Sequence, residues 1–175
     1  MKTVILGDPP PEIVALIARR HALDQDRSDE VWEGDYHMVP APHPWHGYVW
    51  HRLAVLLDQA ARAAGLAGTS EFNLGVQGDF RVPDAGYHRG LPSVLYVPTA
   101  AIVVEVLSPG DETWLKFGFY ARHGVEEICV ADPEAGTIHR IRWFRLAGDA
   151  YEEVDRSDLL GVSAADLEAA IDWPG

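Results

Sequence analysis

A single glutamate interrupts the most apolar run of the chain. Glu105 lies within AAIVVEVLS (100–108), which Pro109-Gly110 ends. Such a run is typical of a strand covered on both faces, and taking an unpaired carboxylate out of water costs several kcal/mol. Glu105 is therefore either a core glutamate paired with an arginine or held by hydrogen bonds, or a metal ligand or general base at the end of a strand. Open α/β sheets place their sites there.

A second carboxylate, Asp84, has a similar setting. In DFRVPD (79–84) the alternation of a strand puts Phe80, Val82 and Asp84 on one face, so we expect Asp84 to end the apolar side of that strand. The alternative is that Asp84 only opens the following turn. Adjacent strands would bring Asp84 and Glu105 within reach of one hard divalent cation. Mg²⁺ favours a few carboxylates together with water and phosphate oxygens.

Lysine is rare in this chain, because only Lys2 and Lys116 occur among 14 basic residues. Lys116 lies on a predicted helix over 112–123. We expect it on the flank of that helix, beside a buried stripe of Trp114, Phe117 and Ala121. It either pairs with Glu112 one turn earlier or places a compact ammonium beside a metal-bound water.

The elements that must position these side chains follow from periodicity. Helical spacing predicts helices over 12–23, 45–64, 112–123 and 164–171, the third capped by Asp111. Apolar runs and turn residues predict a hairpin turning at 33–35 and strands over 71–76, 79–84, 100–108, 127–132, 137–146 and 151–154. Turns are expected at 77–78 and 133–136, and a loop over 86–98. The order predicts the α/β class, a mixed central sheet flanked by helices.

Composition limits the function classes. The 175 residues are 47% hydrophobic and 23% charged, as in one soluble domain over 1–175. The net charge of −13 argues against a general binder of nucleic acid or anionic membranes, because the average field repels polyanions. No stretch approaches the roughly 20 apolar residues of a membrane span. The single cysteine, Cys129, lies in an apolar run, so we expect a buried thiol and a cytoplasmic protein.

Several segments together resemble a known family. The order VPD (82–84), EVLSP (105–109), Lys116, a tyrosine, Gly-Val and Asp-Pro resembles the Uma-two family, a restriction-endonuclease-like branch of the PD-(D/E)XK nuclease superfamily. The segment 30–57 is similar to that family's N-terminal hairpin and first long helix. The resemblance is strongest over 28–145.

The resemblance implies a restriction-endonuclease-like fold and a Mg²⁺-dependent endonuclease, with Mn²⁺ as a substitute metal. Asp84, Glu105 and the Val106 backbone carbonyl would hold the ion, and Lys116 would orient the attacking water. The parent motif places its lysine at position 107, where leucine stands. Lys116 matches the branch in which the lysine lies on the next helix.

The resemblance also implies accessory roles and partners. Glu30 matches a further acidic position and would contact the metal directly or through another ligand. His46 matches a position at the start of the long helix, where a substrate contact and a structural role are equally open. The implied partner is nucleic acid, with DNA favoured, and the exposed aromatic residues are most simply explained by a homodimer.

Three alternatives stay open. The domain could bind nucleic acid or protein without cutting, because a fold does not prove a chemistry. His43, His46 and His51 could bind zinc, although Pro44 breaks the helical spacing that such a site needs. Arg140 and Arg142 could contact phosphates, or they could protect a solvated edge strand from aggregation.

Overall fold

The structure, a computed structural model, describes residues 3–110, 112–134 and 140–173. The expected cap Asp111, the second half of the turn at 133–136 and the start of the strand expected over 137–146 lie outside these ranges. The described part of the chain forms a mixed α/β fold with four helices, α1 (Pro11–Ala22), α2 (Pro44–Ala63), α3 (Thr113–Arg122) and α4 (Ala164–Ala170). Each agrees with a predicted helix to within about two residues at either end.

The strands form two mixed sheets. The first has the order β1-β3-β2-β6-β5-β8, with the bounds β1 Thr3–Ile5, β2 Glu30–Trp32, β3 Asp35–Met38, β5 Asn73–Val76, β6 Asp79–Arg81 and β8 Tyr96–Val97. The second has the order β12-β11-β10-β9-β7-β4, with the bounds β4 Ala67–Ser70, β7 Ala85–His88, β9 Ile102–Val106, β10 Glu127–Ala131, β11 Ile141–Ala147 and β12 Ala150–Val154.

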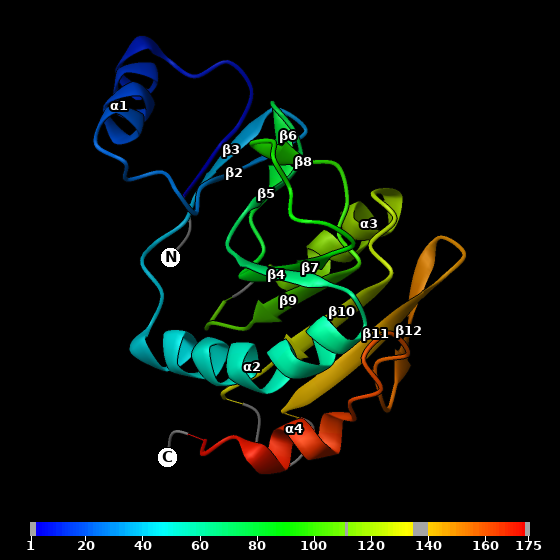
Figure 1. Cartoon of the computed structure of the whole chain (residues 1–175). Helices are drawn as coiled ribbons and strands as arrows, with labels where there is room; N and C mark the ends of the chain where they lie inside the picture. Colours follow the sequence, from blue (N-terminus) through cyan, green and yellow to red (C-terminus); the bar gives the residue numbers. More distant parts are fainter. Residues whose placement is uncertain (1–2, 111, 135–139, 174–175) are drawn as a thin grey trace.

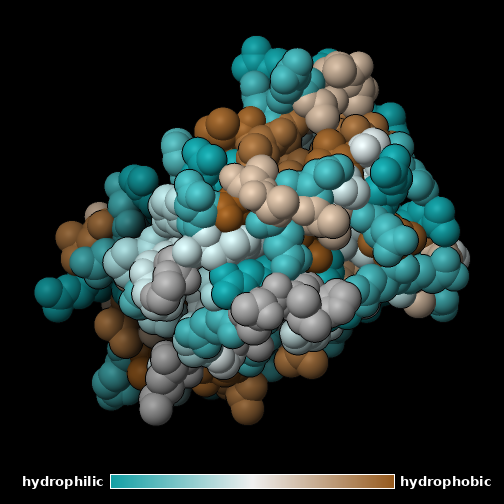
Figure 2. All heavy atoms as spheres, turned by 90° about the horizontal axis from the view of Figure 1, so that it is seen from below, coloured by the Kyte–Doolittle hydropathy of each residue, from teal (hydrophilic) through white to brown (hydrophobic). Residues whose placement is uncertain are grey.

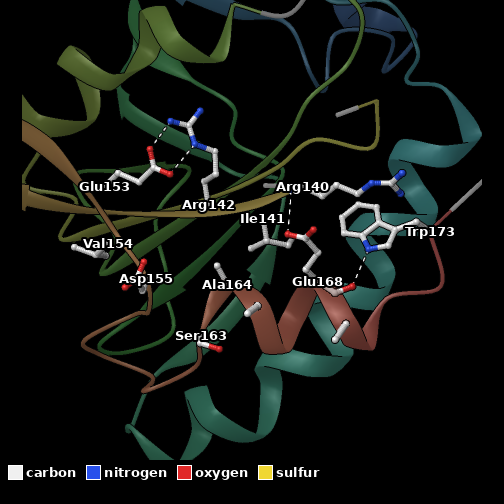
Figure 3. A pocket seen from close by; sticks show the side chains of 12 residues that line it. Arg140, Ile141, Arg142, Glu153, Val154, Asp155, Ser163, Ala164, Glu168 and Trp173 are labelled. Atoms are coloured by element: carbon white, nitrogen blue, oxygen red, sulfur yellow. Dashed lines mark hydrogen bonds and ion pairs between the residues drawn. The ribbon is translucent and has the colours of Figure 1, made fainter. Parts of the chain in front are cut away.

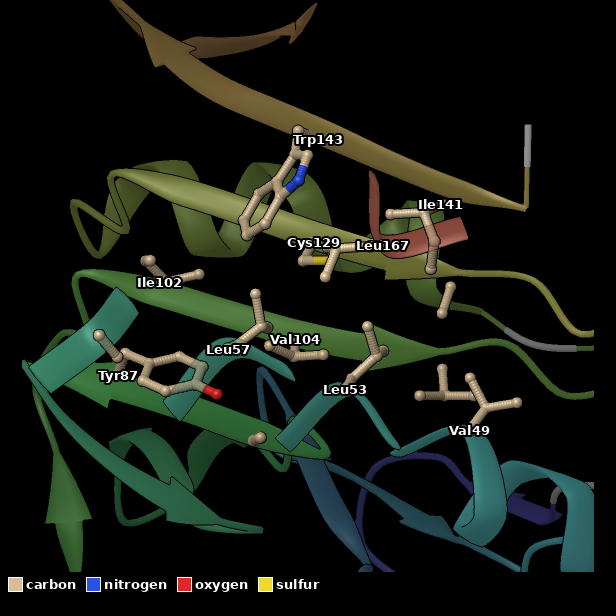
Figure 4. Packing of buried hydrophobic residues seen from close by; sticks show 14 of the residues in the cluster. Val49, Leu53, Leu57, Tyr87, Ile102, Val104, Cys129, Ile141, Trp143 and Leu167 are labelled. Atoms are coloured by element: carbon tan, nitrogen blue, oxygen red, sulfur yellow. The ribbon is translucent and has the colours of Figure 1, made fainter. Parts of the chain in front are cut away.

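The helices cover both faces of the second sheet (Figure 1). α2 and α4 pack on one face, where Figure 4 shows Val49, Leu53 and Leu57 of α2 lying against side chains of the strands. α3 packs on the other face through Phe119 and Tyr120. α1 stands apart from the sheets in Figure 1, and none of its residues is buried.

Strand β9 is buried along its whole length, as its apolar sequence predicts. Ile102, Val104 and Val106 belong to the core under α2 and α4. Val103 belongs to the core under α3. Because side chains alternate along a strand, Glu105 lies on the α3 face with Val103. This alternation aims the one charged side chain of β9 at α3.

The hairpin predicted at 33–35 is confirmed. β2 and β3 pair antiparallel, with Trp32 opposite Asp35. Glu33 and Gly34 between them have φ of 52° and 97°, the pair of positive values that a tight turn matching the strand twist requires.

The loop predicted over 86–98 is wrong in part, because β7 and β8 lie within it, and β4 was not predicted. β4 and β7 each contain a glycine that lies close to an aromatic ring. A Cβ on Gly86 would lie 2.5 Å from the Phe72 ring, and one on Gly68 would lie 3.1 Å from the Tyr87 ring. Strands with glycine at such positions do not show the alternating pattern that identifies a strand in sequence, and β8 is only two residues long.

The outer surface mixes polar and apolar residues. On the face seen in Figure 2, hydrophobic residues lie in several groups separated by hydrophilic ones. Among the described residues, no helix is both long enough and apolar enough to cross a bilayer.

Candidate active site

The pairing of β7 with β9 brings Asp84 to Glu105. The two strands run antiparallel with Ala85 opposite Val104, and Asp84 directly precedes β7. The Val106 N–H donates to Asp84 Oδ2 at 2.7 Å, which fixes the carboxylate beside the end of β9. The expectation that Asp84 ends the strand over 79–84 is therefore wrong, because β6 stops at Arg81 and Asp84 opens a strand of the other sheet. The predicted proximity of the two carboxylates nevertheless holds.

Lys116 is buried, in contrast to its expected place on the flank of α3. Its Nζ lies 2.9 Å from Glu30 Oε1 and 3.3 Å from Glu105 Oε1. The face of α3 turned inward consists of Thr113, Lys116, Phe119 and Tyr120. Trp114, expected in the buried stripe, is instead 43% exposed. A buried ammonium is tolerated here because two carboxylates compensate its charge.

Glu30 is held by three donors from different segments. Its Oε1 accepts from the Val82 N–H at 2.8 Å and contacts Lys116, and its Oε2 accepts from Trp32 Nε1 at 2.7 Å. The side chain is 1% exposed. Because both oxygens are already engaged by protein donors, this geometry favours Glu30 as a positioning residue for Lys116 over a direct metal contact.

Tyr120 completes the cluster. Its hydroxyl donates to Glu105 Oε1, the oxygen that also contacts Lys116. The family motif contains a tyrosine in this region, and the sequence alone assigns it no role. Its spacing of four residues from Lys116 on one helix was the available signal, because such residues share a face.

The electrostatics of the cluster keep Lys116 charged. Burial alone would lower the pKa of Lys116, but the carboxylates of Glu105 and Glu30 raise it above its usual value. Burial raises the pKa of Glu105, with the Lys116 ammonium opposing this shift and the Asp84 charge adding to it. Lys116 is thus suited to bind and stabilise negative charge, and unsuited to accept a proton.

A hard divalent cation fits the oxygens that remain. Within the described residues, Asp84 Oδ1 and Glu105 Oε2 take part in no hydrogen bond, since Val106 and His46 use Asp84 Oδ2 and the partners of Glu105 use Oε1. Three carboxylates surround one ammonium, and a cation would offset the excess negative charge. No group of three or more His, Cys, Asp or Glu suited to a metal is found in the described part of the chain. Mg²⁺ commonly uses one or two carboxylates together with water, so Asp84 Oδ1 and Glu105 Oε2 could hold such an ion.

These groups lie in a cavity of about 410 Å³. Its walls come from the start of β2, the segment before α2, the end of β9 with the turn after it, and α3. The lining includes Glu30, His43, Glu71, Asp84, Glu105 and Lys116. Asp84 is 14% exposed at the side chain, and Glu105 is 4% exposed. The chemistry-bearing groups are thus recessed beneath the surface.

The family model described as "Uma2: Putative restriction endonuclease" matches residues 17–171. The chain belongs to the Uma2 family. Its fold is similar to the crystal structure of "a putative nuclease belonging to DUF820" from Anabaena variabilis ATCC 29413, with a TM-score of 0.65 and 16% identity over 81% of this chain and 90% of that one. A search of the curated proteins finds no match. The family and fold expected from the sequence are thereby confirmed.

In this Uma2 protein the histidines near α2 take separate positions. His43 precedes α2, and its Nδ1 accepts from the Trp45 N–H at 3.3 Å. His46, in the first turn, lies with Nε2 3.1 Å from Asp84 Oδ2. His51 is exposed. His46 thus joins the cluster as an accessory group. Among the described residues, the three histidines do not form a group that could hold a metal ion.

Arg140 and Arg142, for which a phosphate contact and a solvated edge strand were both open, lie away from the cavity of Asp84. Arg140 and Arg142 line a separate groove of about 820 Å³ between the β11–β12 hairpin and α4. Figure 3 shows Arg142 pointing to Glu153 and Arg140 pointing to Trp173. Arg142 forms an ion pair with Glu153, and the Arg140 guanidinium lies 5.0 Å from the Trp173 ring centroid. The structure does not bring either arginine to the cavity of Asp84.

Tyr120→Phe is expected to lower the rate of the nuclease reaction proposed below about tenfold and the free energy of unfolding by about 1 kcal/mol, because one hydrogen bond to Glu105 is lost. Steady-state kinetics and urea denaturation measure the two effects. The matched control is Tyr151→Phe, whose hydroxyl donates to the Val125 carbonyl away from the cavity. That control should lose stability alone. Unchanged kinetics in Tyr120→Phe would contradict a positioning role for Tyr120.

Proposed function

We propose that this protein is a Mg²⁺-dependent nuclease that hydrolyses phosphodiester bonds of nucleic acid, with Mn²⁺ as a substitute metal. The observation that supports it most is the cluster of Asp84, Glu105 and a protonated Lys116 at one cavity. The description of the Uma2 family and the likeness to a nuclease fold support the same function. DNA is the favoured substrate, and we propose a cytoplasmic homodimer as the working form.

Each residue of the cluster would have a separate role in the reaction. Asp84 Oδ1, Glu105 Oε2 and the Val106 carbonyl would hold Mg²⁺, which when bound would polarise a phosphodiester oxygen and lower the pKa of a bound water. Lys116 would orient the attacking water and offset the charge that develops on the phosphoryl oxygens. Glu30 and Tyr120 keep Lys116 and Glu105 in place.

The reaction is a hydrolysis. The water oxygen forms a bond to phosphorus, the bond from phosphorus to the leaving oxygen breaks, and the water proton ends on the leaving group. If the chemistry implied by the family resemblance is kept, the product carries a 5′-phosphate. Lys116 keeps its own proton throughout.

Mg²⁺ is expected to stabilise the folded protein. At a concentration of about 100 times its Kd, a ligand that binds only the folded state adds about 2.7 kcal/mol to the free energy of unfolding. Thermal unfolding with and without Mg²⁺, alongside EDTA-sensitive cleavage of oligonucleotides, checks both parts of the proposal.

Glu105→Gln should remove the stabilisation by Mg²⁺ and the cleavage. The control is Glu127→Gln, a second buried strand glutamate, which binds Ser157 and the turn that follows it. This control should keep both properties. If Mg²⁺ neither stabilises the wild-type protein nor supports cleavage, the protein is instead a binding module that does not cut.

A further inference from the structure

We propose that the site accepts a single-stranded polynucleotide and not an intact duplex, and that Trp45, whose ring contacts His43 of the cavity lining, is the platform on which an unstacked base lies. This inference rests on the proposed function for its chemistry, but it concerns recognition. Three features of the described residues carry it: the depth of the reacting groups, the sign of the charge around them and an exposed aromatic pair beside them.

The reacting groups are too deep for a phosphate held in a helix. Glu105 and Lys116 are 4% and 6% exposed at the side chain, and the cavity of about 410 Å³ is at the small end of pockets that hold one small molecule. A phosphate of an intact duplex stays on the outside of a stiff, stacked rod. To reach Glu105, a strand must leave the stack and enter the cavity, as enzymes that act on extruded nucleotides require.

The charge around the cavity disfavours a duplex. Its lining holds four carboxylates against one ammonium, at Glu30, Glu71, Asp84, Glu105 and Lys116, so the lining stays net negative even with one Mg²⁺ bound at the proposed site. Duplex DNA carries one negative charge per roughly 1.7 Å of axis, about twice the density of a single strand, and its binding depends on basic side chains at phosphates. Single strands therefore meet less repulsion at this mouth.

Three arginines of the second sheet and its loops are already paired within the chain. Arg89 forms an ion pair with Glu126, Arg142 with Glu153 and Arg145 with Asp158. Each of these guanidinium groups has a carboxylate partner that a phosphate must displace. A continuous basic surface that could hold a duplex is thus not supplied by these arginines.

Aromatic rings stand where an unstacked base needs them. His43 lines the cavity, and the Trp45 ring meets the His43 ring edge-on with centroids 5.2 Å apart. Trp45 is 41% exposed and belongs to neither core cluster. The hydrogen bond from the Trp45 N–H to His43 Nδ1 fixes the start of α2 beside the cavity. Stacking on exposed aromatic rings is how proteins bind single strands without reading their sequence.

The test compares four substrates in Mg²⁺: single-stranded DNA, single-stranded RNA, a blunt DNA duplex, and the small diester bis(p-nitrophenyl) phosphate. We expect cleavage of a single strand and of the small diester, and kcat/KM at least tenfold lower for the duplex. The two single strands show which sugar is preferred. A duplex cleaved as well as the single strand overturns the inference.

Trp45→Ala should raise KM for the single strand about tenfold, because the stacking surface for one base is lost. The control is Trp114→Ala, because Trp114 of α3 is exposed to a similar 43%, but its ring packs against Phe117 and against Phe144 of β11, neither of which lines the cavity. Equal KM values for Trp45→Ala and the wild type overturn the role of Trp45.

A binding measurement separates this inference from the proposed function. Fluorescence anisotropy with labelled oligonucleotides and Ca²⁺ in place of Mg²⁺ reports affinity without cleavage. Tighter binding of the single strand, weakened by Trp45→Ala and not by Trp114→Ala, supports the inference even if no substrate is hydrolysed. Binding of the duplex with equal or higher affinity overturns it whether or not the protein cuts.

Discussion

Replacing Lys116 with methionine is expected to lower the free energy of unfolding by about 3 to 5 kcal/mol and to abolish phosphodiester hydrolysis. Removing one partner of a buried ionic cluster leaves uncompensated charge in a low dielectric. Here Glu30 and Glu105, both nearly inaccessible, would face each other without the ammonium between them. Urea denaturation measures the first effect and Mg²⁺-dependent cleavage the second.

The double variant Glu30→Gln with Lys116→Met separates charge from packing. Removing one buried carboxylate along with the ammonium should recover part of the lost stability, because the two sites interact directly and their effects are not additive. Hydrolysis should stay absent, since Lys116 itself is missing. A Lys116→Met variant as stable as the wild type would contradict the buried ionic cluster, and one that still cleaves would contradict the role given to Lys116.

Asp84→Asn is expected to reduce kcat/KM by about 10²- to 10³-fold, the scale of losing one group that stabilises transition-state charge, without loss of stability. The amide oxygen can still accept from the Val106 N–H, so the link between β7 and β9 is kept. At the same time one negative charge leaves a cluster in which Asp84 raises the pKa of Glu105. Stability without Mg²⁺ should therefore be equal to or above that of the wild type.

The control for Asp84→Asn is Glu126→Gln. Glu126 forms an exposed ion pair with Arg89, and such pairs contribute at most about 1 kcal/mol. Its loss should change neither cleavage nor the response to Mg²⁺. Wild-type hydrolysis by Asp84→Asn would remove Asp84 from the proposed metal site.

The sequence could predict the elements whose signal is local. Helices α2 and α3 and strand β9 follow from periodicity and apolar runs. A charged residue inside a buried apolar run needs a partner that compensates its charge, which is why Glu105 could be identified from the sequence alone. The family resemblance added an order of motifs, and the match over residues 17–171 confirms the family.

The predictions that were wrong concern contacts between segments that lie far apart in the sequence. Asp84 was expected beside Glu105 for the wrong reason, since it opens β7 and does not end the preceding strand. The hydrophobicity of Trp114 placed it wrongly in the inward face of α3, while Phe117 does pack against the core. Lys116 is buried because β2 and β9 supply carboxylates to it. No window of sequence contains all of these partners.

The most direct test is crystallographic. Crystals grown or soaked with Mn²⁺, which scatters anomalously and substitutes for Mg²⁺ in the proposal, would reveal the metal position independently of any assay. We expect one anomalous peak between Asp84 Oδ1 and Glu105 Oε2, at roughly the 2.0–2.2 Å of a hard cation bound to carboxylate oxygen. A map with no peak at these two oxygens under saturating Mn²⁺ would contradict the proposed metal site.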